Sequence, residues 1–157
     1  MRIGIGVDAH RFVENRPLLL GGVHVEYALG LAGHSDADVL CHAVGDALLG
    51  AAGLGDLGHH FPDSDSAWAG ISSLFILEKI AESLRERKLK VEYVDSTVIC
   101  QAPKIARYRQ LMEKRIAEAL GVDPKRVNVK GTTTEGMGFE GRGEGIAAWA
   151  VSLLTES

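Results

Sequence analysis

The feature of this sequence that most constrains its fold is the alternation of short strand-like segments with longer segments of helical periodicity. Residues 2–8 are short, apolar and spaced by glycine, and residues 91–100 alternate in polarity and are rich in β-branched side chains, so both segments predict strands. Residues 72–88 carry apolar side chains at helical spacing. The alternation predicts an α/β protein: an α+β two-layer sandwich, with helices on one face of a small mixed β-sheet.

The first helix is expected over about residues 36–50, because Ser35 is a natural N-cap and Asp38 follows three residues later, as in a capping box. Residues 53–70 are rich in Gly, Asp and Ser and predict a long loop, which is usually functional or mobile in a compact domain. The apolar tail over 145–154 predicts either a buried strand or a helix. The other expected elements are a strand or hairpin over 18–25, a helix over 104–120 and a short strand over 127–130.

Composition and charge limit the classes of function. We expect one domain over residues 1–157, since no linker, repeat or low-complexity tract interrupts the chain. The net charge of −4 and the scattered Lys and Arg residues give no electrostatic reason to expect a nucleic-acid partner. We expect no membrane span and no targeting leader, and we expect Cys41 and Cys100 to be buried free thiols, so a cytoplasmic location is the default. The uncovered face of the sheet would need burial, which favours an oligomer.

The sharpest local signal is Asp8-Ala9-His10 at the end of the first strand. Side chains two residues apart on a strand point the same way, so Asp8 and His10 can converge on one ion, joined by His42 from the first helix. One carboxylate and two imidazoles leave a fourth tetrahedral position open, as a catalytic zinc requires. The alternative is that these residues bind no metal. An Asp-X-His triplet is common, and His42 by itself is also compatible with a hydrogen-bonded histidine in the core.

The helix around His42 adds a second observation. Asp38, His42 and Asp46 stand at positions i, i+4 and i+8, so we expect them to line one helix face, with Asp46 orienting a ligand or a histidine or lying in solvent. His59 and His60 are not expected to bind metal, because adjacent residues in a loop seldom bind one ion together.

Two segments before and within the long loop are candidates for ligand binding. Free amides at the start of the first helix favour an anion, and His34 could bond a phosphate oxygen, although capping alone explains Ser35. Residues 56–58 and 61–65 carry acceptors that suit the hydroxyls of a polyol or a second metal, with ordinary surface turns as the alternative.

Two further candidates lie in the last third of the chain. Thr132-Thr133-Thr134-Glu135 offers three hydroxyls for phosphate and a carboxylate for a divalent cation, or a capping box formed by Thr132 and Glu135. Arg142 stands in a glycine-rich stretch that has neither a Walker loop nor a dinucleotide fingerprint. It is an anion clamp or the partner of Glu144 in an ion pair.

Four blocks of the sequence, in order and over nearly the whole chain, together resemble one family. They are GVDAHRF at 6–12, GHSDADVLCHAVGDALLGAAGLGDLGHHFPDSD at 33–65, QAPK at 101–104 and VNVKGTTTEGMGFEGRGEGIA at 127–147. The chain resembles the 2-C-methyl-D-erythritol 2,4-cyclodiphosphate synthases. The resemblance implies a homotrimer whose sheets face a threefold axis, with active sites between subunits. It also implies a step of the non-mevalonate isoprenoid pathway, in which the 2-phosphate of CDP-methylerythritol 2-phosphate attacks the β-phosphate and releases CMP.

The resemblance also implies roles for individual residues. Asp8, His10 and His42 would bind Zn²⁺, and Glu135 would face Mg²⁺ or Mn²⁺ at the diphosphate. His34 and Thr133 would stabilise the transition state. Ala69, Cys100 and Gly136 depart from the family pattern. The implied substrate-binding residues are Asp8, Ala9, His10, His34, Ser35, Asp56, Leu57, Gly58, Phe61, Pro62, Asp63, Ser64, Asp65, Cys100, Gln101, Ala102, Pro103, Lys104, Ile105, Ala106, Thr132, Thr133, Thr134, Glu135, Phe139 and Arg142.

Two other functions are compatible with the same residues. One is a trimeric, metal-stabilised binding protein without turnover, although a closed structural zinc would need a fourth protein ligand. The other is a metallo-phosphohydrolase, in which water attacks in place of the 2-phosphate.

Overall fold

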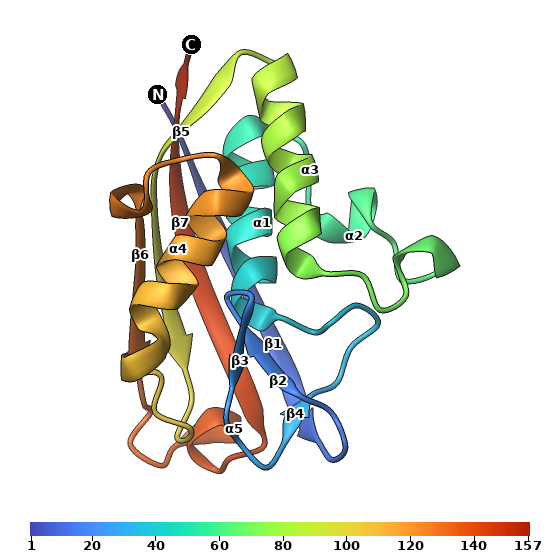
Figure 1. The fold of residues 1–157 in the computed structure, drawn as a ribbon, viewed down its shortest axis with the longest axis vertical. Helices are drawn as coiled ribbons and strands as arrows, with labels where there is room; N and C mark the ends of the chain where they lie inside the picture. Colours follow the sequence, from blue (N-terminus) through green and yellow to red (C-terminus); the bar gives the residue numbers. More distant parts are fainter.

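The computed structural model describes residues 1–157 and confirms a mixed α/β fold (Figure 1). The main sheet has the strand order β4-β1-β7-β5-β6, and β2 and β3 form a separate hairpin. Only β5 and β6 pair in parallel, so the sheet is mixed. The strands are β1 (Arg2–Val13), β2 (Leu18–Leu20), β3 (Val23–Val25), β4 (Gly30–Leu31), β5 (Leu89–Ile99), β6 (Val127–Thr132) and β7 (Gly145–Glu156). The helices are α1 (Val39–Ala52), α2 (Leu57–His60), α3 (Ser73–Glu86), α4 (Arg109–Leu120) and α5 (Gly138–Gly141).

Glycines in β1 set the distance between the sheet and α1. A Cβ atom at Gly4 would lie 2.0 Å from the carbonyl oxygen of Ala47, and one at Gly6 would lie 1.9 Å from that of Ala43. Neither separation is possible for a real side chain, because the neighbouring atoms belong to the helix backbone. The glycine spacing therefore lets α1 pack directly on β1. This close packing brings His42 of the helix near the carboxyl end of the strand.

The two faces of the sheet differ in what covers them. Helices α1, α3 and α4 lie on one side of it (Figure 1), and their apolar side chains form the core with the strands. The other face exposes Ile5 and Val7 of β1 beside Val151 and Trp149 of β7, with which they pair in register. The structure therefore leaves an apolar sheet face open in the single chain.

The start of α1 differs from the sequence prediction. The helix begins at Val39 with Asp38 as its N-cap, so the assignment of the cap to Ser35 is wrong. The Asp38 carboxylate is fully buried and also accepts hydrogen bonds from the backbone N–H groups of Gly21 and Gly22. Asp38 therefore connects the β2–β3 turn to α1 through hydrogen bonds. The spacing had predicted that Asp38 and His42 line one polar helix face, and this prediction is wrong for Asp38.

The other expected helices and strands are present with small changes in their bounds. The loop over 53–70 contains α2 and a 3₁₀ turn at Ser66–Trp68, and the apolar tail forms β7, one of the two alternatives. The helix expected from residue 104 begins at Arg109 after a 3₁₀ turn. Thr132 and Glu135 form no capping box, because the Thr132 hydroxyl bonds the carbonyl of Thr133 and no helix begins there.

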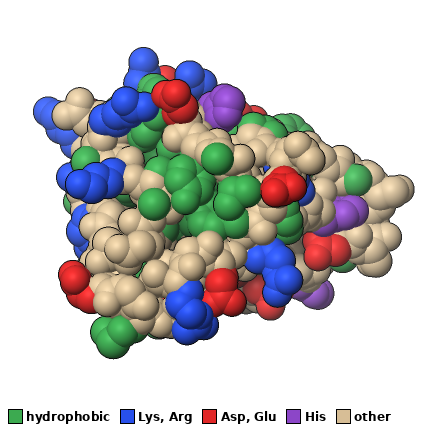
Figure 2. All heavy atoms as spheres, turned by 90° about the horizontal axis from the view of Figure 1, so that it is seen from below, with side chains coloured by type: hydrophobic (Ala, Val, Ile, Leu, Met, Phe, Trp, Pro, Cys, Tyr) green, Lys and Arg blue, Asp and Glu red, His purple; other side chains and the backbone are tan.

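Two surface observations bear on the class of protein. None of the helices combines the length and the apolar character needed to cross a bilayer. On the face seen in Figure 2, hydrophobic side chains gather near the centre while basic and acidic side chains are interspersed around them, so this face has no continuous basic surface.

Candidate active site

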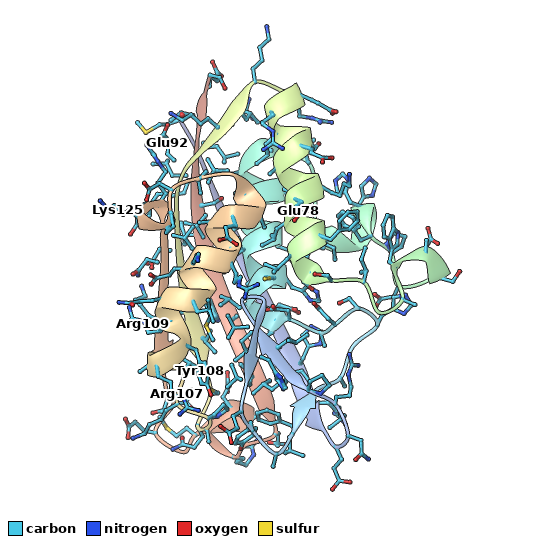
Figure 3. The ribbon with its side chains drawn as sticks, in the orientation of Figure 1. Glu78, Glu92, Arg107, Tyr108, Arg109 and Lys125 are labelled. Atoms are coloured by element: carbon cyan, nitrogen blue, oxygen red, sulfur yellow. The ribbon has the colours of Figure 1, made fainter.

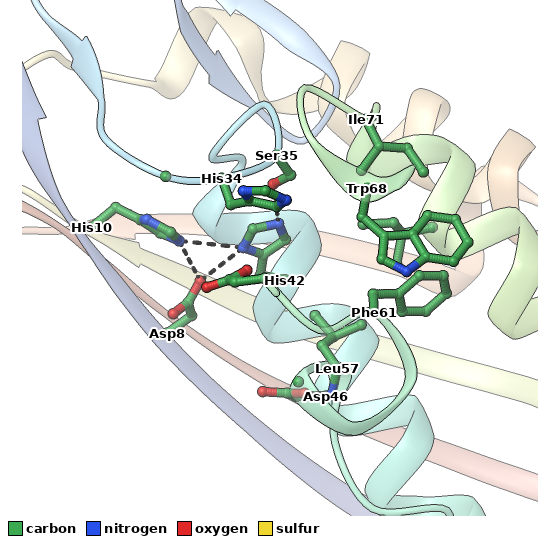
Figure 4. Close-up of a pocket in the computed structure, with 14 residues that line it drawn as sticks. Asp8, His10, His34, Ser35, His42, Asp46, Leu57, Phe61, Trp68 and Ile71 are labelled. Carbon is green, nitrogen blue, oxygen red and sulfur yellow. Dashed lines mark hydrogen bonds and ion pairs between the residues drawn. The ribbon is translucent and has the colours of Figure 1, made fainter. Parts of the chain in front are cut away.

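Three side chains from two elements meet toward the carboxyl end of β1 (Figure 4). Nε2 of His10 lies 2.8 Å from Oδ2 of Asp8, and Nδ1 of His42 lies 3.1 Å from the same oxygen. The two histidine nitrogens are 3.2 Å apart. Donor atoms that share one zinc ion can be separated by at most twice the bond length, or about 4.2 Å. The arrangement therefore fits one metal ion, and it confirms that Asp8, His10 and His42 converge.

The electrostatics of this cluster follow from its partial burial. Burial by itself would raise the pKa of Asp8, but hydrogen bonds and charges from His10 and His42 hold it well below its usual value. Burial would lower the pKa of His10, and the hydrogen bond and charge of Asp8 raise it above 6.5 instead. An ionised carboxylate and two imidazoles together form a ligand set that is typical of binding sites for divalent cations.

Each histidine has a partner on its other nitrogen. Nδ1 of His10 lies 2.6 Å from the carbonyl oxygen of Ala32, which can only accept a hydrogen bond. Nδ1 therefore carries a proton that it donates to this oxygen, and Nε2, beside Asp8, is the nitrogen that can bind a metal. Nε2 of His42 lies 3.0 Å from Oγ of Ser73 and 3.1 Å from Oγ of Ser35, so its Nδ1 faces the cluster. Such outer contacts orient the rings of metal-binding histidines.

A cleft of about 270 Å³ opens beside the cluster. His34 and Ser35 lie with the cluster on its polar side, and Leu57, Phe61 and Trp68 form its apolar side (Figure 4). The rings of Phe61 and Trp68 pack edge to face. The residues that line it are Asp8, His10, Gly33, His34, Ser35, His42, Asp46, Leu57, Gly58, Phe61, Asp63, Trp68, Ile71 and Ile76. A polar end and an apolar wall suit a small ligand that has both a polar or charged part and an apolar part.

Asp46 holds the apolar wall rather than a histidine. Its Oδ1 accepts a hydrogen bond of 2.8 Å from the backbone N–H of Leu57, the first residue of α2. Burial raises the pKa of Asp46, against the effect of this N–H, and the charges of Asp56 and Asp8 raise it further. The carboxylate therefore positions the loop, and neither Asp46 nor the exposed His59 belongs to the metal cluster.

The remaining predicted residues of the long loop have structural contacts. Asp56 caps α2 by accepting from the backbone N–H of His59, and Asp65 caps the following 3₁₀ turn. The carbonyl of Asp65 lies 3.3 Å from Nε2 of His34. Asp56, Pro62, Ser64 and Asp65 do not line the cleft, although they neighbour residues that do.

A second cleft, of about 360 Å³, lies between the start of α4 and the end of β6. Its lining consists of Cys100, Gln101, Pro103, Lys104, Ile105, Ala106, Arg109, Gly131, Thr132 and Thr133. Figure 3 shows Arg109 with Arg107 and Tyr108 near the start of α4. Burial raises the pKa of the Cys100 thiol to about 11, so this cleft offers no thiolate nucleophile. The two clefts share no lining residue, so His34 and Thr133 line different clefts of the chain.

The last predicted residues lie near the second cleft or near β1. Glu135 has a positive φ of 53° and lies 3.5 Å from the Thr133 hydroxyl, so both can face the same ligand. Arg142 forms the exposed ion pair with Glu144 that the sequence left open as an alternative. Phe139 lines a third hollow that includes Ala9 and His10.

Sequence reasoning missed several residues of the site. Trp68 and Ile71 line the first cleft and Arg109 the second, and no motif identified them. Ser73 and Asp36 contact each other and, through Ser73, His42. The block GHSDAD could have identified Asp36 as a candidate, whereas Ser73 has only the local signature of a helix start.

Comparisons with known proteins agree on one family. The model of the YgbB family matches residues 1–155. The 2-C-methyl-D-erythritol 2,4-cyclodiphosphate synthase of Thiobacillus denitrificans is 60% identical over 154 residues, which are 98% of this chain and 96% of that protein. The structure of bifunctional IspDF from Campylobacter jejuni has a TM-score of 0.96 at 44% identity, and 99% of this chain matches 42% of that chain. IspF of Plasmodium falciparum in a CDP complex has a TM-score of 0.87 at 33% identity and covers 99% of this chain and 96% of its own.

Proposed function

The chain belongs to the YgbB family, whose matched members include 2-C-methyl-D-erythritol 2,4-cyclodiphosphate synthases, and we propose how its side chains perform that synthesis. The enzyme is a lyase of isoprenoid biosynthesis. It converts 4-CDP-2-C-methyl-D-erythritol 2-phosphate to 2-C-methyl-D-erythritol 2,4-cyclodiphosphate and CMP. The observation that carries the mechanism is the convergence of Asp8, His10 and His42 at the mouth of a cleft with one apolar wall.

The reaction needs no nucleophilic side chain. An oxygen of the 2-phosphate forms a bond to the β-phosphorus, the bond from that phosphorus to the bridging oxygen breaks, and CMP leaves with the electron pair. Nucleophile and leaving group belong to one molecule, so the protein has to fold the substrate until the reacting atoms lie in line. The buried, protonated Cys100 agrees with this requirement.

Asp8, His10 and His42 would hold Zn²⁺, and Glu135 would hold Mg²⁺ or Mn²⁺. Bound there, these cations would supply charge neutralisation at the phosphate oxygens. In this scheme Leu57 and Phe61 bind the carbon skeleton of the methylerythritol, and His34 donates a hydrogen bond to a phosphate oxygen. The Thr133 hydroxyl donates a hydrogen bond to an oxygen of the diphosphate. A hydrogen-bond donor at this position stabilises the negative charge that develops in the transition state.

We propose that the nucleotide lies in the second cleft. The backbone of residues 100–106 would contact the base and Lys104 a phosphate, with Thr132 as a further donor in the same cleft. Thr134 and Arg142, which do not line this cleft, would be donors from beside it. The CDP bound to IspF of Plasmodium falciparum supports a nucleotide site in this family. Two buried free cysteines, Cys41 and Cys100, support a reducing, cytoplasmic location.

The enzyme would act as a homotrimer, with each active site shared by two neighbours. The placement of His34 and Thr133 in different clefts supports sharing, because an interface between neighbours would bring the two kinds of cleft to one substrate. The open apolar face of β1 and β7 supports sheets that pack around a threefold axis, since large apolar patches usually mark interfaces.

Product analysis tests the reaction. The protein is incubated with Zn²⁺, Mg²⁺ and the substrate in ¹⁸O-labelled water, and ³¹P NMR follows the products. Cyclodiphosphate and CMP without label support the proposal. A linear, labelled phosphate would identify a hydrolase, and an unchanged substrate would identify a binding protein. His42→Ala should abolish turnover and zinc binding, whereas the matched His24→Ala, at an exposed histidine of β3, should do neither.

Complementation tests the shared site. His42→Ala and Thr133→Val subunits are each inactive or slow, and they are refolded together in equal amounts. If each site takes His42 from one subunit and Thr133 from its neighbour, about one quarter of the sites in random mixed trimers are intact. A mixture no more active than its separate components would contradict sites between subunits.

A further inference from the structure

The two ring nitrogens of His42 face different surroundings. Nδ1 points to Asp8 and His10, at 3.1 and 3.2 Å (Figure 4), whereas Nε2 lies 3.0 Å from Oγ of Ser73. A neutral imidazole carries one proton, so only one nitrogen can present a lone pair to a metal. Which nitrogen does so is decided by the group that faces the other one.

Ser73 is held in a single orientation. It is the first residue of α3 and is completely buried. Its hydroxyl donates to Oδ1 of Asp36, and its backbone N–H donates to Oδ2 of the same carboxylate at 2.9 Å. An ionised carboxylate is only an acceptor, so the proton of the Ser73 hydroxyl belongs to this contact. The lone pairs of Oγ are then left to accept the N–H at Nε2 of His42.

We propose that Ser73 and Asp36 are positioning residues that fix His42 with its proton on Nε2 and its lone pair on Nδ1, directed at the metal. The chain of contacts runs from Asp36 through Ser73 to His42. It rests on the metal role given to His42 in the proposed function, and it adds two residues that touch neither the metal nor the substrate.

Ser35 is a weaker candidate for the same task. Its Oγ lies 3.1 Å from Nε2 of His42 and also accepts from the backbone N–H of Ala37 at 3.2 Å. No carboxylate fixes the direction of its hydroxyl proton, and the side chain lines the open cleft. The Ser35 hydroxyl is therefore free to turn toward a substrate, whereas the Ser73 hydroxyl is not.

The structure separates positioning from stability. Ser72, the N-cap of α3, makes no side-chain capping bond, so Asp36 caps this helix through the backbone N–H of Ser73. Ser73→Ala removes only the hydroxyl and leaves that cap in place. Asp36→Asn has nearly the same shape, but its amide can donate to Ser73 and so release the hydroxyl proton toward His42.

The test measures zinc affinity by competition with a chromophoric chelator, for the unmodified chain, Ser73→Ala, Asp36→Asn and the exposed neighbour Ser72→Ala as control. Loss of an outer contact typically costs 10–100-fold in metal affinity, so we expect a loss of about that size in Ser73→Ala and Asp36→Asn and none in Ser72→Ala. Histidine ¹⁵N NMR is measured on the zinc-loaded proteins, because in the metal-free chain the Asp8 carboxylate also favours a proton on Nδ1 of His42. The unmodified chain should show His42 bound through Nδ1 with a slowly exchanging proton on Nε2. This proton should exchange faster in both variants, a change that a purely structural role would not produce.

The outcomes distinguish this inference from the proposed function. If the unmodified chain binds no zinc, the metal site is refuted and the positioning role with it. If it binds zinc and both variants bind within about twofold of Ser72→Ala, the positioning role alone is refuted. Thermal unfolding of the metal-free proteins identifies a variant that is merely misfolded, and the other variant then decides the question.

Discussion

Replacing Asp38 by Asn should destabilise the fold although the side chain hardly changes shape. The carboxylate is fully buried and accepts three backbone hydrogen bonds. Oδ1 accepts from Gly21 at 2.9 Å and from Cys41 at 3.0 Å, and Oδ2 accepts from Gly22 at 2.7 Å. An amide has one oxygen, so in Asp38→Asn the N–H of Gly22 would face an NH₂ group instead of an acceptor.

The size of the effect follows from that single unmatched donor. A buried donor that loses its partner costs about 1–3 kcal/mol, and here two donors also point at each other, so we expect a loss of about 2–3 kcal/mol. For a chain of this length that corresponds to a fall in Tm of about 4–12 °C. Asp38→Ala leaves all three donors without a partner and should cost more.

The assay is thermal unfolding followed by circular dichroism, with metal chelated and at one protomer concentration, because metal binding and assembly both shift Tm. The matched control is Asp123→Asn, at an exposed cap where the carboxylate accepts only the N–H of Lys125. Equal Tm values for the two variants would refute the claim that the buried Asp38 carboxylate organises the start of α1.

Two further predictions follow from packing and from charge. Gly6→Ala should lower the free energy of unfolding by more than about 4 kcal/mol, because the new Cβ would overlap the backbone of α1. Gly50→Ala, whose new Cβ would have only one neighbouring atom, at 3.8 Å, should raise the free energy of unfolding by about 0.5–1 kcal/mol. Urea unfolding of both variants checks this, and a mild effect of Gly6→Ala would contradict the close packing. Hydrogen bonds from Thr155, Arg126 and Lys90 lower the pKa of Glu92 from 4.5 to about 2, so its contribution to stability is complete above pH 4.5 and is lost as the pH falls toward 2. In Glu92→Gln, the free energy of unfolding measured in urea should depend less on pH in that range, and an unchanged dependence would count against the pairing.

The metal cluster could be predicted because its geometry is mostly local. Asp8 and His10 share a side of β1 through the two-residue period of a strand, and the glycines of the same strand bring α1 close enough for His42 to join them. The helical spacing of His42 only suggested that it joins this cluster, and the resemblance to a known family identified it as a metal ligand.

The parts that could not be predicted depend on contacts between distant segments. Asp38 fits a local capping box, and its actual role comes from a turn 16 and 17 residues earlier in the chain. The contact between Asp36 and Ser73 spans 37 residues, and nothing near Ser73 distinguishes it from an ordinary serine at a helix start. The tail over 145–154 was ambiguous because both faces of β7 are apolar. One face packs on the core and the other carries Trp149 and Val151, so the sequence lacks the polar alternation of a strand with one solvated face.

The open sheet face leads to a prediction about assembly. Val151 on β7 pairs with Ile5 on β1, and its side chain is 41% exposed in the single chain. A charge at such a position costs a monomer little, because exposed substitutions usually change stability by less than about 0.5 kcal/mol. In a trimer whose sheets face one another the same charge would be buried without a partner, which costs several kcal/mol.

Val151→Glu should therefore dissociate the proposed trimer without unfolding the protomer. Leu111 of α4 is also 41% exposed but lies on the helical side, so Leu111→Glu is the matched control. Sedimentation equilibrium should give three times 16.8 kDa for the unmodified chain and for Leu111→Glu, and a single protomer for Val151→Glu. Because the active sites are taken to be shared, Val151→Glu should also lose turnover while its intact Asp8, His10 and His42 still bind zinc. A Val151→Glu protein that keeps the mass of the unmodified chain would show that this face is not where the subunits meet.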